Sequence, residues 1–303
     1  MADVVPEALA VNGSGGEQIS VLEEKELFVE NNFLYQEKLL AAGYNENIGA
    51  ILSSALDPIG LDVHPFMIGW YNKKVGAKFR LEYPEDTLAF VIISGPDVFE
   101  KCIVPYVTCQ LQENPDFRTE DPLDDSMKHV FGVVKEDLQI AGFEVDTFHD
   151  FDLHPSRRPK VLVQTAAHVA GAVQYLHKTY LPEKIQRERF FEKSNLSGVA
   201  IHPTYGGWYA IRGVVIFRDL PVYEQKLEQP QDLQIFNNPE TIARVIELFA
   251  YNWQNNEWRN MHPGSGFKYS DDFQKYLDTE PAQRWNFVKN YCLNHVNLQQ
   301  TCH

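Results

Sequence analysis

Residues 86–94, DTLAFVIIS, decide the fold class, because they form a continuous apolar run that has the length of one strand. A run that is apolar at successive positions predicts a strand covered on both faces. Elsewhere along the chain, strand patterns and helix patterns mix without the strict βαβ alternation that marks a parallel sheet. The sequence therefore predicts an α+β fold with a largely antiparallel sheet.

Outward from this strand, the first half of the chain predicts a helix over 46–56, a strand and turn over 61–75, a helix over 97–109, an acidic proline-containing loop over 113–126, a helix over 127–143 and a strand over 145–155. The second half predicts a helix over 165–180, an exposed linker or helix over 183–194, strands over 197–203 and 208–217, a helix over 239–258 and two short helices over 271–296. Gly206 and Gly207 can adopt positive φ, so we expect the two strands to form a hairpin around 204–207.

The ends of the chain differ in composition from its middle. Residues 1–18 are rich in glycine and have no periodicity, which favours disorder. Residues 21–44 carry apolar residues at the spacing of an amphipathic helix. We therefore expect an N-terminal extension over 1–44, one domain over 45–293, and a tail over 294–303.

Charge and composition exclude several classes of protein. A formal charge of −15 argues against binding to nucleic acid or to an anionic membrane, which both require a broad positive surface. No stretch approaches 18 consecutive apolar residues, so we expect no membrane span, and we expect no signal peptide. The cysteines show no CxxC spacing and predict free thiols in a cytoplasmic protein: Cys102, Cys109, Cys292 and Cys302.

Residues 154–171, HPSRRPKVLVQTAAHVAG, are the densest cationic run in this acidic chain. Arg157, Arg158 and Lys160 stand between prolines that stiffen the backbone, and small residues then surround His168. This pattern indicates a surface that receives a large, partly anionic ligand. The alternatives are a solvated loop, an alanine-rich helix packed closely on a sheet, and a structural histidine.

A second stretch, SGVAIHPTYGGWYAIRGVVIF at 197–217, follows the first in the same order as in a known family. Together the two stretches resemble the cblC-type cobalamin-processing proteins, the cytosolic vitamin B12 chaperones of animals. The resemblance also includes LDVHPFMIGWYN at 61–72, DTLAFVIIS at 86–94 and EPAQRW at 280–285, and it spans about 45 to 290. Identical runs of this length are far more specific than a short motif.

The resemblance implies a nitroreductase-like flavin-reductase fold, in which helices flank the antiparallel sheet. It also implies an enzyme that binds cobalamin base-off and removes its upper axial ligand, as an alkylcobalamin dealkylase that uses glutathione and as a cyanocobalamin reductase that uses FAD or FMN and ultimately NADPH. The partners implied are a cblD-type adaptor and the downstream route to methionine synthase and methylmalonyl-CoA mutase.

By the same resemblance, His168 contacts the displaced nucleotide tail of cobalamin. Small, apolar and amide groups around it complete the expected cobalamin contacts, which are Gln164, Tyr175, Ser197, Gly198, Val199, Ala200 and Ile211. For the residues on the two strands, the alternative is an ordinary sheet interior. His168 and Gly171 match part of a motif in which histidine ligates cobalt, but Ala166 stands where that motif has aspartate, so we assign no cobalt ligand. His177 could approach the cobalt face, although a surface histidine is the default.

Glutathione carries two carboxylates and a thiolate, so an acidic protein needs focused positive charge to bind it. The resemblance assigns Arg212, Arg259 and Arg284 to this task. Each could instead form a surface salt bridge, and Arg212 is the best candidate because a charge within an apolar strand needs a reason. The thiolate comes from glutathione, so we predict no protein nucleophile, and Ala200 replaces a cysteine of a relative.

Two other functions stay open on the sequence alone. The protein could carry cobalamin without transforming it, or it could be a flavin-dependent reductase of another substrate. The presence of the three arginines disfavours the first alternative. The stretches at 154–171 and 197–213 disfavour the second, because a general nitroreductase has no need for them.

Overall fold

The computed structural model describes residues 48–190, 198–221, 227–262 and 266–295. The predicted N-terminal extension and most of the predicted tail lie outside these residues. The helices are α2 Ile48–Leu56, α3 Ile68–Lys74, α4 Val104–Glu113, α5 Pro122–Ile140, α6 Val163–Val169, α7 Glu183–Phe190, α8 Pro239–Asn252, α9 Asp271–Asp278 and α10 Pro281–His295. The strands are β1 Leu61–Met67, β2 Thr87–Ser94, β3 Val145–His149, β4 Gln174–Leu176, β5 Val199–Ile201 and β6 Ala210–Pro221.

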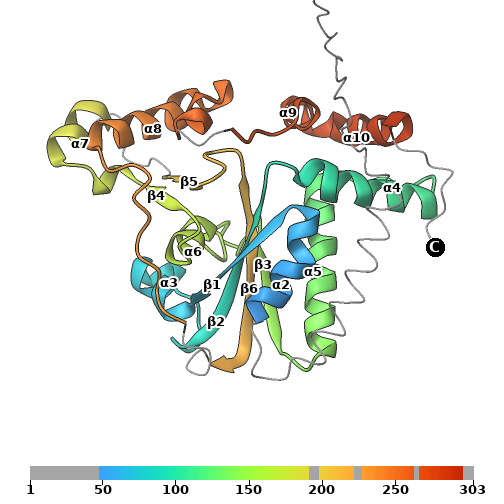
Figure 1. Cartoon of the computed structure of the whole chain (residues 1–303), viewed down its shortest axis with the longest axis horizontal. Coiled ribbons are helices and arrows are strands. Elements are labelled where there is room, and N and C mark those ends of the chain that lie inside the picture. Colours follow the sequence, from blue (N-terminus) through green and yellow to red (C-terminus); the bar gives the residue numbers. More distant parts are fainter. Residues whose placement is uncertain (1–47, 191–197, 222–226, 263–265, 296–303) are drawn as a thin grey trace, which may run out of the picture.

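The main sheet has four strands in the order β1-β2-β6-β3, and every neighbouring pair is antiparallel. All eight residues of β2 are buried, which confirms the central strand predicted from its apolar run. Strands β4 and β5 form a separate antiparallel pair. Helices cover the main sheet on both faces (Figure 1), so the α+β prediction is confirmed.

Each face of the main sheet has its own apolar core. Helices α2, α4, α5, α9 and α10 cover one face, where Phe99, Phe131 and Tyr276 are fully buried. Helices α3 and α6 cover the other face, where Ala166 and Ala167 have no exposed surface. These small side chains let α6 lie close to the sheet, as the close-packing alternative expected. Each large apolar side chain that is fully buried in these cores contributes about 1.5–3 kcal/mol to the free energy of folding.

A third apolar cluster joins α8 to the β4–β5 pair, through residues such as Leu176, Val199 and Ile246. Figure 1 shows α8 above this small sheet, and α9 and α10 above α4 and the upper end of α5. Among the described residues, no helix is both long enough and apolar enough to span a membrane.

The predicted loop over 113–126 is wrong at its C-terminal end, because α5 already begins at Pro122. The carboxylate of Asp121 accepts hydrogen bonds from the amides of Leu123 and Asp124, both at 3.1 Å. Proline fits the first helical position, where no N–H is needed. Asp121, Asp124 and Asp125 therefore form a helix cap and a first turn, whereas residues 114–120 form a loop as predicted.

The predicted helix over 165–180 is also wrong. Helix α6 ends at Val169, and Gly171 has φ +71°, a conformation that ends a helix and that glycine adopts readily. The chain then runs as β4, so Tyr175 lies in a strand and His177 directly follows it. A smaller error concerns residues 68–74, which form α3 where we expected a turn.

Strands β5 and β6 do not form the predicted hairpin. Strand β5 pairs with β4, whereas β6 pairs with β2 and β3 in the main sheet. Within the segment between β5 and β6, an isolated antiparallel bridge joins His202 to Gly206, and it does not extend into a ladder. Residues 214–217 have no exposed surface, and burial on both faces requires a central position in the larger sheet.

Candidate functional site

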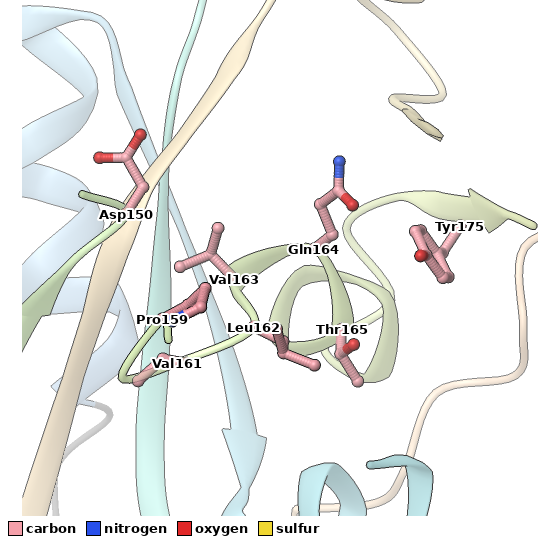
Figure 2. Close-up of a pocket in the computed structure, with 8 residues that line it drawn as sticks. All are labelled: Asp150, Pro159, Val161, Leu162, Val163, Gln164, Thr165 and Tyr175. Atoms are coloured by element: carbon pink, nitrogen blue, oxygen red, sulfur yellow. The ribbon is translucent and has the colours of Figure 1, made fainter. Parts of the chain in front are cut away.

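One end of the main sheet brings some of the predicted residues close to a pocket. Strand β3 ends there, β6 begins there, and α5 begins beside them (Figure 1). A pocket of about 190 Å³ lies between the end of β3, the start of α6 and β4, and it is lined by Asp150, Pro159, Val161, Leu162, Val163, Gln164, Thr165 and Tyr175 (Figure 2). Sites that enclose a whole drug-sized ligand have about 300–1,000 Å³. This pocket can therefore hold a side group or one edge of a larger ligand.

The pocket brings together three of the predicted cobalamin residues. Gln164 and Tyr175 line it, and Gly198 makes room for the Tyr175 ring. A Cβ atom at position 198 would lie 2.3 Å from the hydroxyl oxygen of Tyr175. The pairing of Tyr175 with Ala200 places this ring on the β4–β5 sheet. Glycine at 198 is thus required for the ring position seen here.

Other predicted cobalamin residues contribute to cores instead of the pocket lining. Val199 belongs to the cluster beneath α8, and Ala200 and Ile211 belong to the core on the α6 side of the main sheet. Ser197 lies outside the described residues. A contact from these positions would have to come from the backbone or from a shift of the side chains.

His168 does not line the pocket in this structure. Its Nδ1 donates to the carbonyl of Val173 at 3.3 Å, and its Nε2 lies 3.6 Å from a carboxylate oxygen of Asp232. The side chain is only 10% exposed. His168 therefore joins α6 to the segment that contains Asp232, and its predicted contact with a nucleotide tail stays a prediction.

His177 lies two residues after Tyr175, so both side chains point to the same side of the extended chain. The two rings are nearly parallel, with centroids 6.2 Å apart, and Tyr180 packs edge-on against both. Nδ1 of His177 lies 2.7 Å from the hydroxyl oxygen of Thr179. An aromatic group of three rings thus extends the Tyr175 side of the pocket.

The basic stretch forms turns beside α6, and two of its three cations pack on aromatic rings. Arg158 lies 5.8 Å from the ring centroid of Phe79, and Lys160 lies 5.7 Å from that of Phe148. Arg157 is exposed and has φ +60°. Part of this positive charge thus serves local packing through cation–π contacts.

Arg212 is buried, with 7% of its surface exposed, at an irregularity in β6. Ile92 pairs with Gly213 and Ile93 with Ile211, so β6 has one extra residue at Arg212. Nε of Arg212 donates to the hydroxyl of Ser94 at 2.8 Å. Within the described part of the chain, no hydrogen bond or ion pair to its two terminal nitrogens is found. Those nitrogens can therefore bind a ligand.

Arg259 and Arg284 have donors committed to the protein itself. Nε of Arg259 donates to Asn256, one terminal nitrogen donates to the carbonyl of Gly207, and the guanidinium lies 4.5 Å from the ring centroid of Trp258. Arg284 donates to the carbonyls of Leu277 and Thr279, at the end of α9. Both arginines are structural contacts in this state.

The three arginines are only partly brought together. Arg212 and Arg259 both lie near Tyr269, whose pKa is raised by burial and lowered in part by these two cations. Arg284 lies instead beside Tyr276, with 5.6 Å between its guanidinium and the ring centroid. Tyr269 and Tyr276 are connected through the ring of Phe273.

Two acidic residues that we did not predict lie near Arg212. Burial raises the pKa of Asp150, and Arg212 lowers it in part. Burial and the neighbouring Asp121 and Asp150 raise the pKa of Asp124 to about 6, again against a lowering effect of Arg212. No sequence signal marked Asp150, because the predicted strand over 145–155 placed it in the strand interior, whereas β3 ends at His149.

Two of the three described cysteines, Cys102 and Cys292, are poor candidates for a nucleophile. Burial raises the pKa of Cys102 to about 12, although Arg212 lowers it in part, and burial also raises the pKa of Cys292. Both thiols are therefore protonated at neutral pH. Cys102 nevertheless lies close to Arg212, whose terminal nitrogens can bind a ligand.

Asp62, His64 and His202 have ligand atoms within 4.8 Å of one another. Nδ1 of His202 accepts hydrogen bonds from the amides of Thr204 and Tyr205, both at 3.1 Å. Burial, with the nearby His64 and His262, lowers the pKa of His202 to about 3, so the ring is neutral and its proton is on Nε2. A metal ion would need the lone pair at that nitrogen, so this group is better suited to hydrogen bonding than to metal binding.

The sequence and the α+β fold of this chain, with a pocket at one end of its main sheet, can be compared with those of known proteins. The sequence profile of the methylmalonic aciduria and homocystinuria type C family matches residues 60–288. The chain belongs to this family.

Two curated relatives carry the name cyanocobalamin reductase / alkylcobalamin dealkylase. The protein of Gallus gallus is 38% identical over 80% of this chain and 96% of its own length. The protein of Homo sapiens is 34% identical over 77% of this chain and 78% of its own length. Among solved structures, the B12-trafficking protein CblC of Caenorhabditis elegans has a TM-score of 0.68 and 26% identity, and the match covers 89% of this chain and 98% of that one.

Proposed function

We propose that this protein binds cobalamin base-off and removes its upper axial ligand, acting as an alkylcobalamin dealkylase and a cyanocobalamin reductase. The observation that carries the proposal is the extent of the match to relatives of that name, which reaches 38% identity over 80% of this chain. The end-of-sheet pocket and the buried Arg212 support it, because they offer a small cavity beside a cation whose ends can bind a ligand.

In the dealkylation, the thiolate sulfur of glutathione attacks the alkyl carbon. A sulfur–carbon bond forms, the cobalt–carbon bond breaks, and its electron pair stays on the metal as cob(I)alamin. Arg212 would pair with a carboxylate of glutathione and hold the thiolate in line, and this positioning can lower the barrier considerably. The raised pKa values of Cys102 and Cys292 support an external thiol as the nucleophile. Arg259 and Arg284 would bring fewer available donors, because each already donates to a backbone carbonyl.

In the decyanation, one electron reduces cob(III)alamin to cob(II)alamin and cyanide leaves. A flavin, FAD or FMN, reduced by NADPH, would supply the electron. The Tyr175 ring and the Gln164 amide suit a planar heterocycle with polar edges, so the pocket could receive one edge of such a group. The antiparallel sheet with helices on both faces is likewise compatible with a nitroreductase-like fold.

We further propose that the corrin lies over the pocket, with Gln164, Tyr175 and Gly198 beside it, and that His168 meets the displaced tail after its contact with Asp232 opens. Ser197, Val199, Ala200 and Ile211 stay proposed cobalamin contacts, and His177 a candidate for the cobalt face. A cytoplasmic location, and transfer through a cblD-type adaptor toward methionine synthase and methylmalonyl-CoA mutase, complete the proposal.

The visible spectrum of the protein mixed with methylcobalamin tests this function. We expect a blue shift on mixing, which reports base-off binding, and conversion to cob(I)- or cob(II)alamin after anaerobic addition of glutathione. Arg212→Met should keep the blue shift and slow the conversion about tenfold to a hundredfold, since hydrogen bonds to charged groups contribute roughly 1.5–3 kcal/mol. Arg218→Met is the matched control, because Arg218 lies on the same strand and is exposed.

Other outcomes decide between the alternatives. A blue shift without conversion would leave a carrier of cobalamin. No spectral change with any cobalamin would refute the assignment and favour a flavin-dependent reductase of another substrate.

A further inference from the structure

The charges around Arg212 do not form a simple site for an anion. Two carboxylates, those of Asp124 and Asp150, lie close enough to Arg212 for their pKa values to respond to it. One guanidinium and two carboxylates carry a net charge of −1 when all three are ionised. A ligand that presents only carboxylates would be attracted by Arg212 and repelled by the two acids, so the repulsion would offset the binding energy from the arginine.

A zwitterionic group fits this set of charges better than an anionic one. An amino-acid end places an ammonium and a carboxylate on the same carbon atom, so each can meet a protein charge of opposite sign. The γ-glutamyl end of glutathione is such a group. Its other end, the glycine carboxylate, carries no ammonium and lacks this match.

Asp150 is better placed than Asp124 to meet the ammonium. Asp150 lines the pocket together with Gln164 and Tyr175. Its side chain is exposed to solvent, although neighbouring atoms shield the carboxylate enough to raise its pKa. Figure 2 shows the Asp150 carboxylate and the Gln164 amide pointing to the same side of the pocket. Asp124 lies in the first turn of α5 and does not line the pocket.

The backbone holds Asp150 next to Arg212. The amide of Asp150 donates to the carbonyl of Arg212 at 3.1 Å, directly beyond the last β3–β6 pair, which joins His149 to Gly213. The extra residue in β6 is Arg212 itself, so the position of the cation and that of the carboxylate depend on one irregularity in one strand.

We propose that Asp150 binds the α-ammonium of a γ-glutamyl thiol while Arg212 binds the adjacent α-carboxylate, so that the pair selects glutathione over thiols that lack the amino group. This inference rests on the proposed thiol-dependent dealkylation. Asp150 acts on selectivity, and it takes no part in the transfer of the alkyl group.

The test compares two thiols on the methylcobalamin-loaded protein. Glutaryl-cysteinyl-glycine has every atom of glutathione except the α-amino group. We expect its kcat/KM for dealkylation, and its affinity for the loaded protein by calorimetry, to be about tenfold lower than those of glutathione. Asp150→Asn should lower both values for glutathione by about the same factor and leave those for glutaryl-cysteinyl-glycine nearly unchanged. Glu144→Gln is the matched control, because it removes an exposed negative charge just before the same strand.

The outcomes separate this inference from the function on which it rests. If the unmodified protein uses both thiols equally well, or if Asp150→Asn lowers both by the same factor, the inference is wrong and the dealkylase function stands. If neither thiol reacts or binds, both the function and the inference are wrong. The comparison of the two thiols on the unmodified protein needs no variant, so it remains decisive even if Asp150→Asn does not fold.

Discussion

Replacing Gly213 by alanine should destabilise the protein strongly, because this glycine permits the close contact of β3 and β6 at the site. Gly213 has φ +153°, and a Cβ atom there would lie 2.2 Å from the carbonyl oxygen of Phe148 and 3.0 Å from Cα of His149. Both are backbone atoms, so no side-chain rotation can relieve the contact. The two strands must therefore move apart near Arg212.

The size of the effect follows from two contributions. The unusual φ costs a residue with a side chain about 1–3 kcal/mol. Separating the strands at the His149–Gly213 pair removes one or two hydrogen bonds, each with a net contribution of about 0.5–1.5 kcal/mol. We expect a total loss of about 1.5–6 kcal/mol, a large share of the roughly 5–15 kcal/mol that stabilises a typical protein.

Urea unfolding, followed by circular dichroism and by tryptophan fluorescence, measures this loss. With an m value of about 3 kcal/mol per molar, the midpoint should fall by roughly 1 M. Gly132→Ala is the control, because Gly132 is exposed within α5 and nothing lies within 4 Å of the added atom. The control should gain about 0.8–1 kcal/mol in helix propensity. A midpoint for Gly213→Ala within about 0.3 M of the unmodified protein would refute the reasoning, since ordinary uncertainty in unfolding experiments is of that order.

Three further predictions follow from the site. Asp124→Asn should become more stable relative to the unmodified protein as the pH rises from 4 to 7. Burial raises the pKa of Asp124 to about 6, so the native state of the unmodified protein holds more protons than its unfolded state in that window and loses stability as the pH rises. Urea midpoints of both proteins at several pH values measure this, and a difference that stays constant with pH would contradict it. Gly198→Ala should displace the Tyr175 ring and weaken binding of methylcobalamin, as measured by spectral titration. Gly76→Ala is the control and should leave the affinity unchanged, since nothing lies within 4 Å of an atom added there. Equal affinities in both variants would mean that the ring position is unimportant. His202 should be neutral with its proton on Nε2 at pH 7, as measured by ¹⁵N NMR of the imidazole, and a signal from an Nδ1–H form would show that the backbone amides do not set the tautomer.

The elements predicted well are those in which local sequence and burial agree. Strand β2 is apolar throughout and is buried throughout, so its pattern alone was sufficient. Helix α8 begins at Pro239, as predicted from the proline at a first helical position. These signals depend on neighbours in the sequence and need no knowledge of the fold.

The errors arose where distant contacts decide the structure. The end of α6 depends on Gly171, whose positive φ places it against Pro230, where an added Cβ atom would lie 2.7 Å from the proline ring. No local pattern distinguishes such a glycine from one tolerated within a helix. Likewise, the partner of β5 depends on burial of β6 in the main sheet, which a reading of turn residues cannot show.

The site was predictable only in part for a related reason. The basic stretch and the strand with Arg212 stood out by their composition. Asp150 and Asp124 did not, because a carboxylate is unremarkable in a chain with 42 acidic residues. Their importance comes from closeness to Arg212, which only the fold establishes.

If Arg259 binds a ligand, the segments that its guanidinium now joins lose one of their contacts. Its guanidinium donates to the carbonyl of Gly207 and so joins that turn to the segment that follows α8. A second hydrogen bond, from the amide of Gly207 to the carbonyl of Arg259 at 3.1 Å, joins the same two segments. An anion that recruits this arginine must first compete with the protein's own joint. Binding an anion through the Arg259 guanidinium would therefore loosen the contact between the Gly207 turn and the segment after α8, while the apolar cluster still holds α8 on the β4–β5 pair.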